Sequence, residues 1–506
     1  MASTVTPDPK SVAGKALHVE ARTQLLVIGA GPAGLAAAIE AAGQGLSVVL
    51  VDENPVSFTT MGDEVPLHYG QGMSGLARNR NAMLEAFIGS EPQIEIAFEA
   101  GVDVRLGTTC WGLYANGPSV TWLPGLVAGL NDEERCWMLQ ADHVVVAAGR
   151  RDMGLGFPGW EKPGVMGATA AVSLASRYGA LAPRRVVVLG SSTDAVTAAL
   201  SLREAGVEIV AMVEQAAETL APAALIATLI EGGTEILSGH VVREAAGRDA
   251  VEAALVGMVD ANGRATGDER AIACDGIILA VGATPVIDLL DALGCEIAFQ
   301  PERGGYAPLV DADQRTSLPD VFAVGDGAGI WPSKTVDRAV AEAEGRRAVA
   351  AIVKNLGIGG GAPPPLRVLP DLPNHDIGAY RLAWVRASVI EARAEFHVCQ
   401  CEEVTAREIL EVRPPRYLDW QNERRNDRSL SALLGAEPPN PDQIKRLTRA
   451  GMGPCQGRQC GYTMAHIVAA VQGRPVEQVG FYRIRPPLKP VTLGELASLD
   501  EREPAA

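Results

Sequence analysis

Cysteine is scarce in this chain: its 506 residues include 8. So low a density excludes a disulfide-stapled scaffold. Long uncharged apolar runs are lacking as well, and no stretch of about 18 such residues predicts a membrane-spanning helix. The first residues, Met1 to Glu20, are mixed polar and carry no apolar stretch that would form a secretory signal. We therefore expect a cytoplasmic protein whose thiols stay reduced.

Basic charge is also in deficit, because 44 Lys and Arg face 61 Asp and Glu and leave a net charge of −17. Such a surface repels phosphate backbones and anionic lipids, which argues against nucleic-acid and peripheral membrane roles. The hydrophobic share of 47% and the charged share of 21% are ordinary for a globular protein. The length predicts about three domains.

The first of two glycine loops follows an apolar run at 24–28 that predicts a buried parallel strand. An Ala-rich helix and a second strand at 47–51 come next. In such a unit the glycines allow a tight turn, backbone approach to a pyrophosphate and close helix packing, and the acid ending the second strand can bind a ribose. The alternative is a glycine turn without a ligand. The residues expected to bind a dinucleotide, FAD or NAD, are Gly29, Gly31, Pro32, Ala33, Gly34, Asp52 and Glu53.

A second unit of the same kind departs from the pattern at one place. Its strands are predicted at 185–189 and 207–213, and its loop and acid supply Gly190, Ser192, Ala195 and Glu214. The serine puts a Cβ where a pyrophosphate would press against the backbone. Two interpretations stay open: NAD(P) binds with altered geometry, or the domain is kept for structure or for a nucleotide that delivers no hydride. The steric argument favours the second, so a bound NAD(P) is doubtful.

Three phrases close these units, each an apolar strand that runs into a glycine turn. They lie at 142–150, 275–285 and 318–328, and a helix is predicted at about 336–353 after the last. Gly325-Asp326 could be a simple strand-end turn with an Asx cap. From residue 23 to about 355, however, the chain resembles the glutathione-reductase-like flavoproteins with two dinucleotide-binding domains. In that superfamily the aspartate matching Asp326 hydrogen-bonds the ribityl chain of FAD, so the resemblance implies FAD and adds Gly149, Gly325 and Asp326 to its contacts.

Four of the cysteines are isolated, and four gather behind a Gly/Pro-rich linker. No close cysteine pair precedes residue 399, which excludes disulfide-reductase chemistry, and Cys110, Cys136, Cys274 and Cys295 are expected to be inert buried thiols. The other four form two close pairs, the donor set of a tetrahedral zinc or an iron–sulfur cluster. Zinc stays an alternative, but a flavin nearby favours a redox-active cluster. The expected metal ligands are Cys399, Cys401, Cys455 and Cys460.

The phrases around these pairs are distinctive. Cys399-Gln-Cys-Glu-Glu-Val-Thr405 and Thr448-Arg-Ala-Gly-Met-Gly-Pro-Cys-Gln-Gly-Arg-Gln-Cys460 resemble the bacterioferritin-associated-ferredoxin-like [2Fe–2S] domain. More narrowly, they and the tail at 483–497 resemble the large subunits of opine- and proline-type amino-acid dehydrogenases and of hydrogen cyanide synthase. The implied fold class is α/β: two Rossmann-like dinucleotide-binding domains followed by a small, mostly helical [2Fe–2S] domain.

Two segments depart from that family. An insertion around 420–441 lengthens the spacing between the cysteine pairs, and we expect a loop there. The segment at 61–72 replaces the glycine-rich stretch that the family places beside the flavin. His68 and Tyr69 within it could act near the flavin, although ordinary packing is the simpler interpretation.

The expected domain organisation follows from these boundaries. It is a tail at 1–22, an FAD-binding domain at 23–155 and 301–356, an NAD(P)-binding-like domain at 156–300, a linker at 357–372, the [2Fe–2S] domain at 373–480 and a tail at 481–506.

The resemblance implies an FAD- and [2Fe–2S]-containing electron-transfer subunit of a heteromeric dehydrogenase or oxidase. Its substrate would be a secondary amine or amino acid of the opine, proline, hydroxyproline, sarcosine or glycine type, oxidised on a second FAD-containing subunit, with a small third iron–sulfur subunit as a further partner. The alternatives are a stand-alone NAD(P)H-dependent FAD and iron–sulfur reductase and a non-catalytic [2Fe–2S] sensor. No His, Ser or Cys constellation indicates a catalytic acid or base, so no catalytic residue is assigned.

Overall fold

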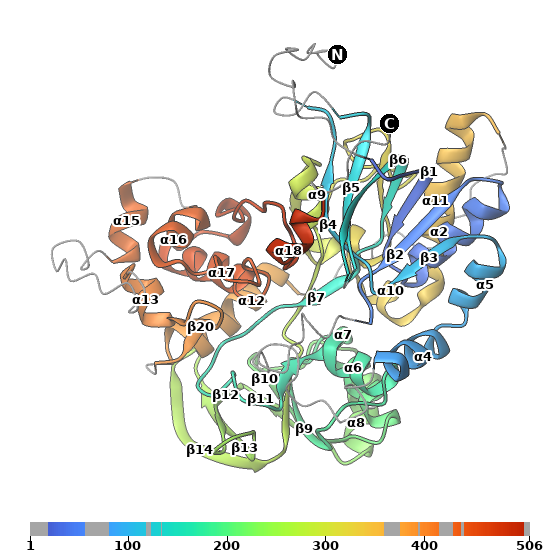
Figure 1. Cartoon of the computed structure of the whole chain (residues 1–506). Coiled ribbons are helices and arrows are strands. Elements are labelled where there is room, and N and C mark those ends of the chain that lie inside the picture. Colours follow the sequence, from blue (N-terminus) through green and yellow to red (C-terminus); the bar gives the residue numbers. More distant parts are fainter. Residues whose placement is uncertain are drawn as a thin grey trace.

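Three bodies of secondary structure make up the protein (Figure 1). The computed structural model describes residues 19–55, 80–117, 123–132, 134–358, 375–392, 395–413, 429–436 and 440–499. The linker at 357–372 and the segment at 61–72 lie almost wholly outside these residues. The loop expected at 420–441 is wrong in part, because Leu430–Ala436 form a helix, and the rest of that range lies mostly outside the described residues. In the described part of the chain, no helix has both the length and the apolar composition to cross a membrane.

The first body is built on the predicted apolar strands, which pair in parallel. These strands are apolar along their whole length because both faces of a parallel sheet are covered. Antiparallel β4 and β5 extend one edge, and β19 pairs with β6. The strands in sheet order are β3 (Asp103–Leu106), β2 (Val48–Asp52), β1 (Ala21–Ile28), β6 (Cys136–Val146), β5 (Leu126–Asn131) and β4 (Thr109–Tyr114), with β19 (Val321–Ala323) beside β6.

Helices from both ends of the nucleotide-binding part cover this sheet. α2 (Pro32–Gly43) packs closely on α11 (Arg338–Leu356), because Gly345 has no Cβ to strike the carbonyl of Ala33. The helix predicted at about 336–353 is confirmed as α11, and a further short helix precedes it. α10 (Pro332–Val336) ends first, and Asp337 then caps α11 by accepting a hydrogen bond from the backbone N–H of Ala339 at 3.0 Å. The remaining helices of this body are α4 (Arg80–Ser90) and α5 (Gln93–Glu99).

The second body contains an all-parallel sheet of five strands, with the predicted strands at its centre. In order they are β11 (Glu235–Ser238), β10 (Glu208–Glu214), β9 (Arg185–Leu189), β15 (Gly276–Leu279) and β8 (Val165–Gly167). Its helices are α6 (Ala168–Ser176), α7 (Thr193–Glu204) and α8 (Ala223–Glu231). Gly190 turns the chain between β9 and α7 with a φ of +99°, which favours glycine.

Smaller sheets that the sequence pattern did not predict join the bodies. A three-stranded antiparallel sheet consists of β12 (His240–Ala246), β13 (Ala253–Val259) and β14 (Ala265–Ala273). Two ribbons are formed by β7 (Arg150–Asp152) with β16 (Ala283–Pro285) and by β17 (Ile297–Gln300) with β18 (Gly305–Pro308). α9 (Asp288–Leu293) lies between these ribbons in the chain.

The third body is mostly helical (orange to red in Figure 1) and shares a core with the second. Buried side chains of β9 and β10 belong to the same apolar cluster as Trp384 of α12 and Ile467 of α17. A hydrogen bond of 2.6 Å from Trp160 Nε1 to the carbonyl of His397 reinforces the contact. The elements are α12 (Ile377–Val385), a π-helical turn (Arg386–Ile390), β20 (His397–Cys399), β21 (Val404–Thr405), α13 (Ala406–Glu411), α15 (Leu430–Ala436), α16 (Pro441–Thr448), α17 (Gly461–Gln472) and α18 (Leu493–Ala497).

An ion pair lies buried beneath the turn that follows β19. Lys334 Nζ stands 2.9 Å from Glu344 Oε2, and their side chains are 0% and 2% exposed. Burial lowers the pKa of Lys334 and raises that of Glu344, so each group depends on the other to stay charged. Lys334 also donates to the carbonyls of Gly325 and Gly329, and Glu344 accepts from the N–H of Gly325. The pair therefore fixes the backbone of this turn.

Replacing Lys334 by Met should lower the free energy of unfolding by about 3–5 kcal/mol, because Glu344 is left buried without its partner. Urea denaturation followed by circular dichroism measures the loss. The double variant K334M/E344M removes both charges and should recover part of that stability. A K334M protein as stable as the wild type would contradict the dependence of the fold on this pair.

Candidate functional site

A cavity of about 830 Å³ lies where the first body meets the other two. That volume falls within the range of small-molecule and cofactor sites, about 300–1,000 Å³. All ten residues that the sequence predicted to bind FAD line it: Gly29, Gly31, Pro32, Ala33, Gly34, Asp52, Glu53, Gly149, Gly325 and Asp326.

The glycine loop leaves room where a pyrophosphate would lie. Gly29 has a φ of +111° and runs against the backbone of Ala147, so the turn itself requires glycine. A Cβ on Gly31, by contrast, would meet no atom within 4 Å and would project into open space. Gly31 is the N-cap of α2 and provides no side chain to the first N–H groups of that helix. These amides remain able to bind an anion.

Asp52 ends β2 with its carboxylate facing the loop. Its Oδ2 accepts from the N–H of Ala30 at 2.6 Å, and its Oδ1 accepts from the N–H of Asn54 at 2.8 Å. Burial raises the pKa of Asp52, against the opposing effect of these hydrogen bonds. Asp52 Oδ1 also accepts from the side-chain amide of Asn54 at 3.0 Å. Its Oδ2 has a further lone pair, so Asp52 can still accept a hydrogen bond from a ribose hydroxyl.

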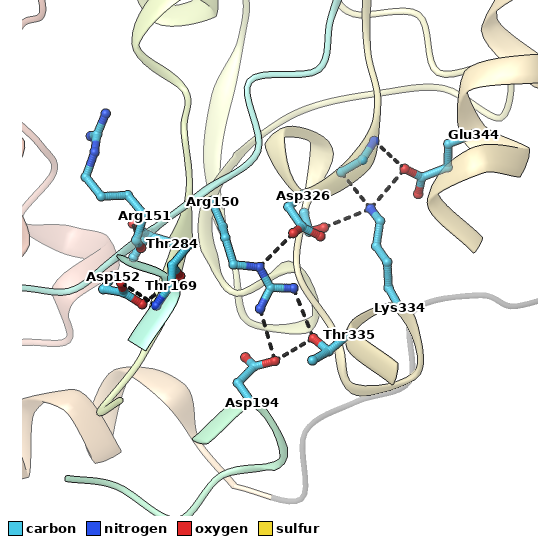
Figure 2. Close-up of polar contacts among 12 residues, drawn as sticks. Arg150, Arg151, Asp152, Thr169, Asp194, Thr284, Asp326, Lys334, Thr335 and Glu344 are labelled. Atoms are coloured by element: carbon cyan, nitrogen blue, oxygen red, sulfur yellow. Dashed lines mark hydrogen bonds and ion pairs between the residues drawn. The ribbon is translucent and has the colours of Figure 1, made fainter. Parts of the chain in front are cut away.

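Arg150 connects the two nucleotide-binding bodies across the cavity (Figure 2). Its Nε lies 2.6 Å from Asp326 Oδ2, its Nη1 lies 3.2 Å from Asp194 Oδ1, and its Nη2 donates to Thr335 Oγ1 at 3.1 Å. The pKa of Arg150 is raised, because the two carboxylates outweigh its burial. The sequence motifs predicted Asp326 at this place but not Arg150, although Arg150 directly follows Gly149.

Asp152 forms a separate polar contact in the same wall (Figure 2). It accepts from the backbone N–H and the hydroxyl of Thr169, both at 2.8 Å, at the start of α6. Burial raises the pKa of Asp152 to about 6, although these hydrogen bonds lower it. Its charge therefore changes within the range over which many enzymes work.

The second glycine loop has a different environment. Ser192 caps α7 by accepting from the N–H of Ala195 at 3.3 Å, so one of the free amides at that helix end is already bound. Glu214, predicted to bind a ribose, is 0% exposed. Its Oε2 accepts from the hydroxyls of Ser191 at 2.6 Å and of Tyr380 at 3.0 Å. The structure thus brings together the four predicted residues, Gly190, Ser192, Ala195 and Glu214. The Glu214 carboxylate, however, is buried and is not accessible to a ribose.

The four clustered cysteines come together from the two predicted phrases. The Cys399 thiol lies beside those of Cys401 and Cys460, and the Cys401 thiol lies beside that of Cys455. The thiols therefore lie in a row, with Cys460 beside Cys399 at one end and Cys401 beside Cys455 at the other. The Cys401 thiol and burial raise the pKa of Cys455, so this thiol stays protonated unless a cation lies beside it. Among the described residues no three metal-binding side chains surround a single ion site.

Backbone N–H groups also reach this site, since the N–H of Gly451 donates to Cys399 Sγ at 3.3 Å. Glycine is required beside the cysteines: a Cβ on Gly453 would strike Cys401, and one on Gly457 would strike Tyr482. The isolated cysteines of the nucleotide-binding bodies are buried as expected, and burial raises the pKa of Cys110 to about 12 and of Cys274 to about 11.

The loop between Cys455 and Cys460 also reaches the large cavity. Its Arg458 lines the cavity together with Lys489, which pairs with Glu53. Thr463, just after the loop, donates to the carbonyl of Gly154. The cysteine site and the dinucleotide cavity therefore share one stretch of chain, a contact that no local motif predicted.

Comparison with known families decides the assignment. The pyridine nucleotide-disulphide oxidoreductase model matches residues 23–345. The chain belongs to that family. The model of the sarcosine oxidase A3 domain matches residues 436–499, which include the second cysteine pair.

The chain is similar to named family members over nearly its whole length. It is 30% identical to the A subunit of opine oxidase from Agrobacterium tumefaciens (strain Ach5), over 94% of this chain and 91% of the relative. It is 27% identical to the HcnB subunit of hydrogen cyanide synthase from Pseudomonas aeruginosa, over 94% and 98%. In fold it is similar to L-proline dehydrogenase from P. horikoshii, with a TM-score of 0.63, 21% identity and coverage of 95% and 81%. The resemblance to subunits of opine- and proline-type amino-acid dehydrogenases and of hydrogen cyanide synthase is confirmed.

Replacing Gly31 by Val should leave the fold intact and weaken FAD binding about tenfold or more, about 1.4 kcal/mol. The added Cβ meets no protein atom within 4 Å and projects, with the methyl groups it carries, into the space left for the pyrophosphate. Fluorescence titration of the apoprotein with FAD measures the affinity. Gly43→Ala, at an equally open glycine on the exposed end of α2, is the matched control and should bind as the wild type does. Equal affinity in G31V would place the dinucleotide elsewhere.

Proposed function

We propose that this chain is the FAD- and [2Fe–2S]-containing electron-transfer subunit of a heteromeric dehydrogenase that oxidises a secondary amine or amino acid. The substrate would lose its hydride on a partner flavoprotein subunit. The observation that supports this most directly is the shared wall of the two sites: the loop between Cys455 and Cys460 places Arg458 on the cavity that the glycine loop forms.

The residues of the first site fit FAD. The uncapped amides of α2 and the open space at Gly31 suit a pyrophosphate, Asp52 suits the adenosine ribose, and Asp326 suits a ribityl hydroxyl. Arg150 would hold Asp326 in place through the ion pair at 2.6 Å. When bound, FAD supplies an acceptor of two electrons that can release them singly.

The cysteine site fits a binuclear cluster better than a single zinc ion. A [2Fe–2S] cluster takes two thiolates on each iron, and the row of thiols here offers two at each end. Each end takes one cysteine from each phrase, so both phrases must be folded together before either iron can be held. The N–H of Gly451 beside Cys399 is a donor of the kind that tunes such clusters.

The relatives support the division of labour. The opine oxidase and hydrogen cyanide synthase relatives are both named as subunits, and a model of sarcosine oxidase matches the C-terminal region. We therefore expect the substrate pocket on the partner.

The cysteine assignment predicts a specific loss of iron. Replacing any one of the four clustered cysteines by serine removes a ligand from one iron. Bound iron and the [2Fe–2S] electron paramagnetic resonance signal should therefore fall to near zero in each variant, at Cys399, Cys401, Cys455 or Cys460. Cys274→Ser, at an isolated buried thiol, should keep full iron content. Bound FAD, read from its absorbance, should persist in all five. Stoichiometric zinc in the wild type would overturn the cluster assignment.

The subunit role predicts that amine-dependent dye reduction appears only in a complex. Co-expression with the partner flavoprotein should give reduction of a one-electron dye by an opine, proline or sarcosine, and this chain alone should give none.

Replacing Cys455 by Ser in the complex should leave substrate-dependent bleaching of the partner flavin intact. It should slow dye reduction at least about tenfold, which corresponds to an extra barrier of about 1.4 kcal/mol. Oxidation of an amino acid by the isolated chain would contradict the proposal. Rapid flavin bleaching by NADH would favour the stand-alone reductase.

A further inference from the structure

Glu214, the acidic residue of the second glycine-loop unit, is hydrogen-bonded by a helix of the same chain. Glu214 Oε2 accepts from Tyr380 of α12, while its Oε1 accepts from the N–H of Ala216 at 2.8 Å. Burial raises the pKa of Glu214, and its hydrogen bonds to Ser191, Tyr380 and Ala216 oppose that rise. With 0% of its surface exposed, the carboxylate offers no approach to a ribose hydroxyl.

The space between the start of α7 and α12 is small. The cavity there measures about 70 Å³, and Ser192, Asp194, His375, Tyr380 and Arg381 are among its walls. Sites for cofactors usually need about 300 Å³ or more, so a dinucleotide does not fit between these two helices. The opposite side of the α7 start, with Asp194 and Ala195, borders the large cavity assigned to FAD. Asp194 places a carboxylate in the first turn of α7, where a pyrophosphate would otherwise lie, and this carboxylate is already paired with Arg150.

α12 is anchored firmly in this position. Arg381, 3% exposed, donates to the carbonyl of Ala283 at 2.7 Å and to that of Gly304 at 3.0 Å. Asp376 caps the helix by accepting from the N–H of Ala379 at 2.9 Å. Trp384 is fully buried in the core that joins the second and third bodies. Displacing α12 would expose this core and leave Glu214 without one of its donors.

We propose that Tyr380 on α12 is the residue that excludes pyridine dinucleotides from the second glycine loop. The Tyr380 hydroxyl makes the hydrogen bond to Glu214 that a ribose hydroxyl would otherwise make. The rest of α12 occupies the space in which the nucleotide would lie. Electrons consequently cannot enter this chain from NADH or NADPH at the second domain. This inference does not depend on amine oxidation by a partner, and its failure would leave that proposal standing.

The decisive comparison restores the glycine motif with and without the tyrosine ring. FAD-loaded wild type, Ser192→Gly, Tyr380→Phe and the double variant S192G/Y380A are titrated calorimetrically with ADP-ribose and with NADH. FAD loading keeps the first site filled. We expect saturable binding only in S192G/Y380A and no detectable binding by the other three proteins at ligand concentrations about tenfold above the Kd of that variant, a difference of at least about 1.4 kcal/mol. Y380F keeps the ring, so it should remain closed.

Each other outcome overturns the inference. Binding by the wild type, or by S192G alone, would show that α12 does not close the site and that the serine or nothing excludes the nucleotide. Absence of binding in S192G/Y380A, with normal FAD absorbance and circular dichroism, would remove Tyr380 as the determinant. If that variant does not fold, hydrogen exchange of the FAD-loaded wild type decides. The α12 amides must exchange at the same rate with and without ADP-ribose at about 5 mM, a concentration about tenfold above a weak, submillimolar Kd. A change in their exchange rate when the ligand is added refutes the inference.

Discussion

The position of the cavity wall depends on a single buried ion pair. Lys334 and Glu344 bind the backbone of the Gly325 turn from below, and Asp326 stands on that turn. Asp326 in turn orients Arg150, which reaches Asp194 at the start of α7. The sheets of the first and second bodies have separate apolar cores, and this chain of ion pairs fixes the position of one sheet relative to the other. The cost of losing a charge is largest at Lys334 and Glu344, because they are the buried members and each would leave the other unpaired.

The first nucleotide site was predictable because its determinants are local. A strand, a tight turn and a helix impose their residues within a short stretch, and Asp52 follows from the end of the neighbouring strand. Gly149, Gly325 and Asp326 were found through family resemblance, and the structure places all of them on one cavity. The same reasoning located the four cysteines, since ligand spacing within a phrase is also a local property.

Contacts between distant segments were not predictable in the same way. Tyr380 belongs to an ordinary apolar helix, and nothing in its neighbours indicates that its hydroxyl meets Glu214. Arg458 looked like part of a cysteine phrase, yet it lines the dinucleotide cavity. The sheet of β12, β13 and β14 escaped notice because β14 is exposed along nearly its whole length and shows no apolar alternation. Tertiary packing decides such positions.

The continuous core of the second and third bodies bears on how the chain is made. Synthesis delivers the second body first, and its face stays bare until α12 and α17 emerge to cover it. During that interval the nascent protein carries the kind of exposed apolar surface that chaperones bind and that drives aggregation. A gene fragment that stops before α12 would therefore encode an insoluble product, and the helical body is a part of the nucleotide-binding scaffold rather than a module that could be exchanged between proteins.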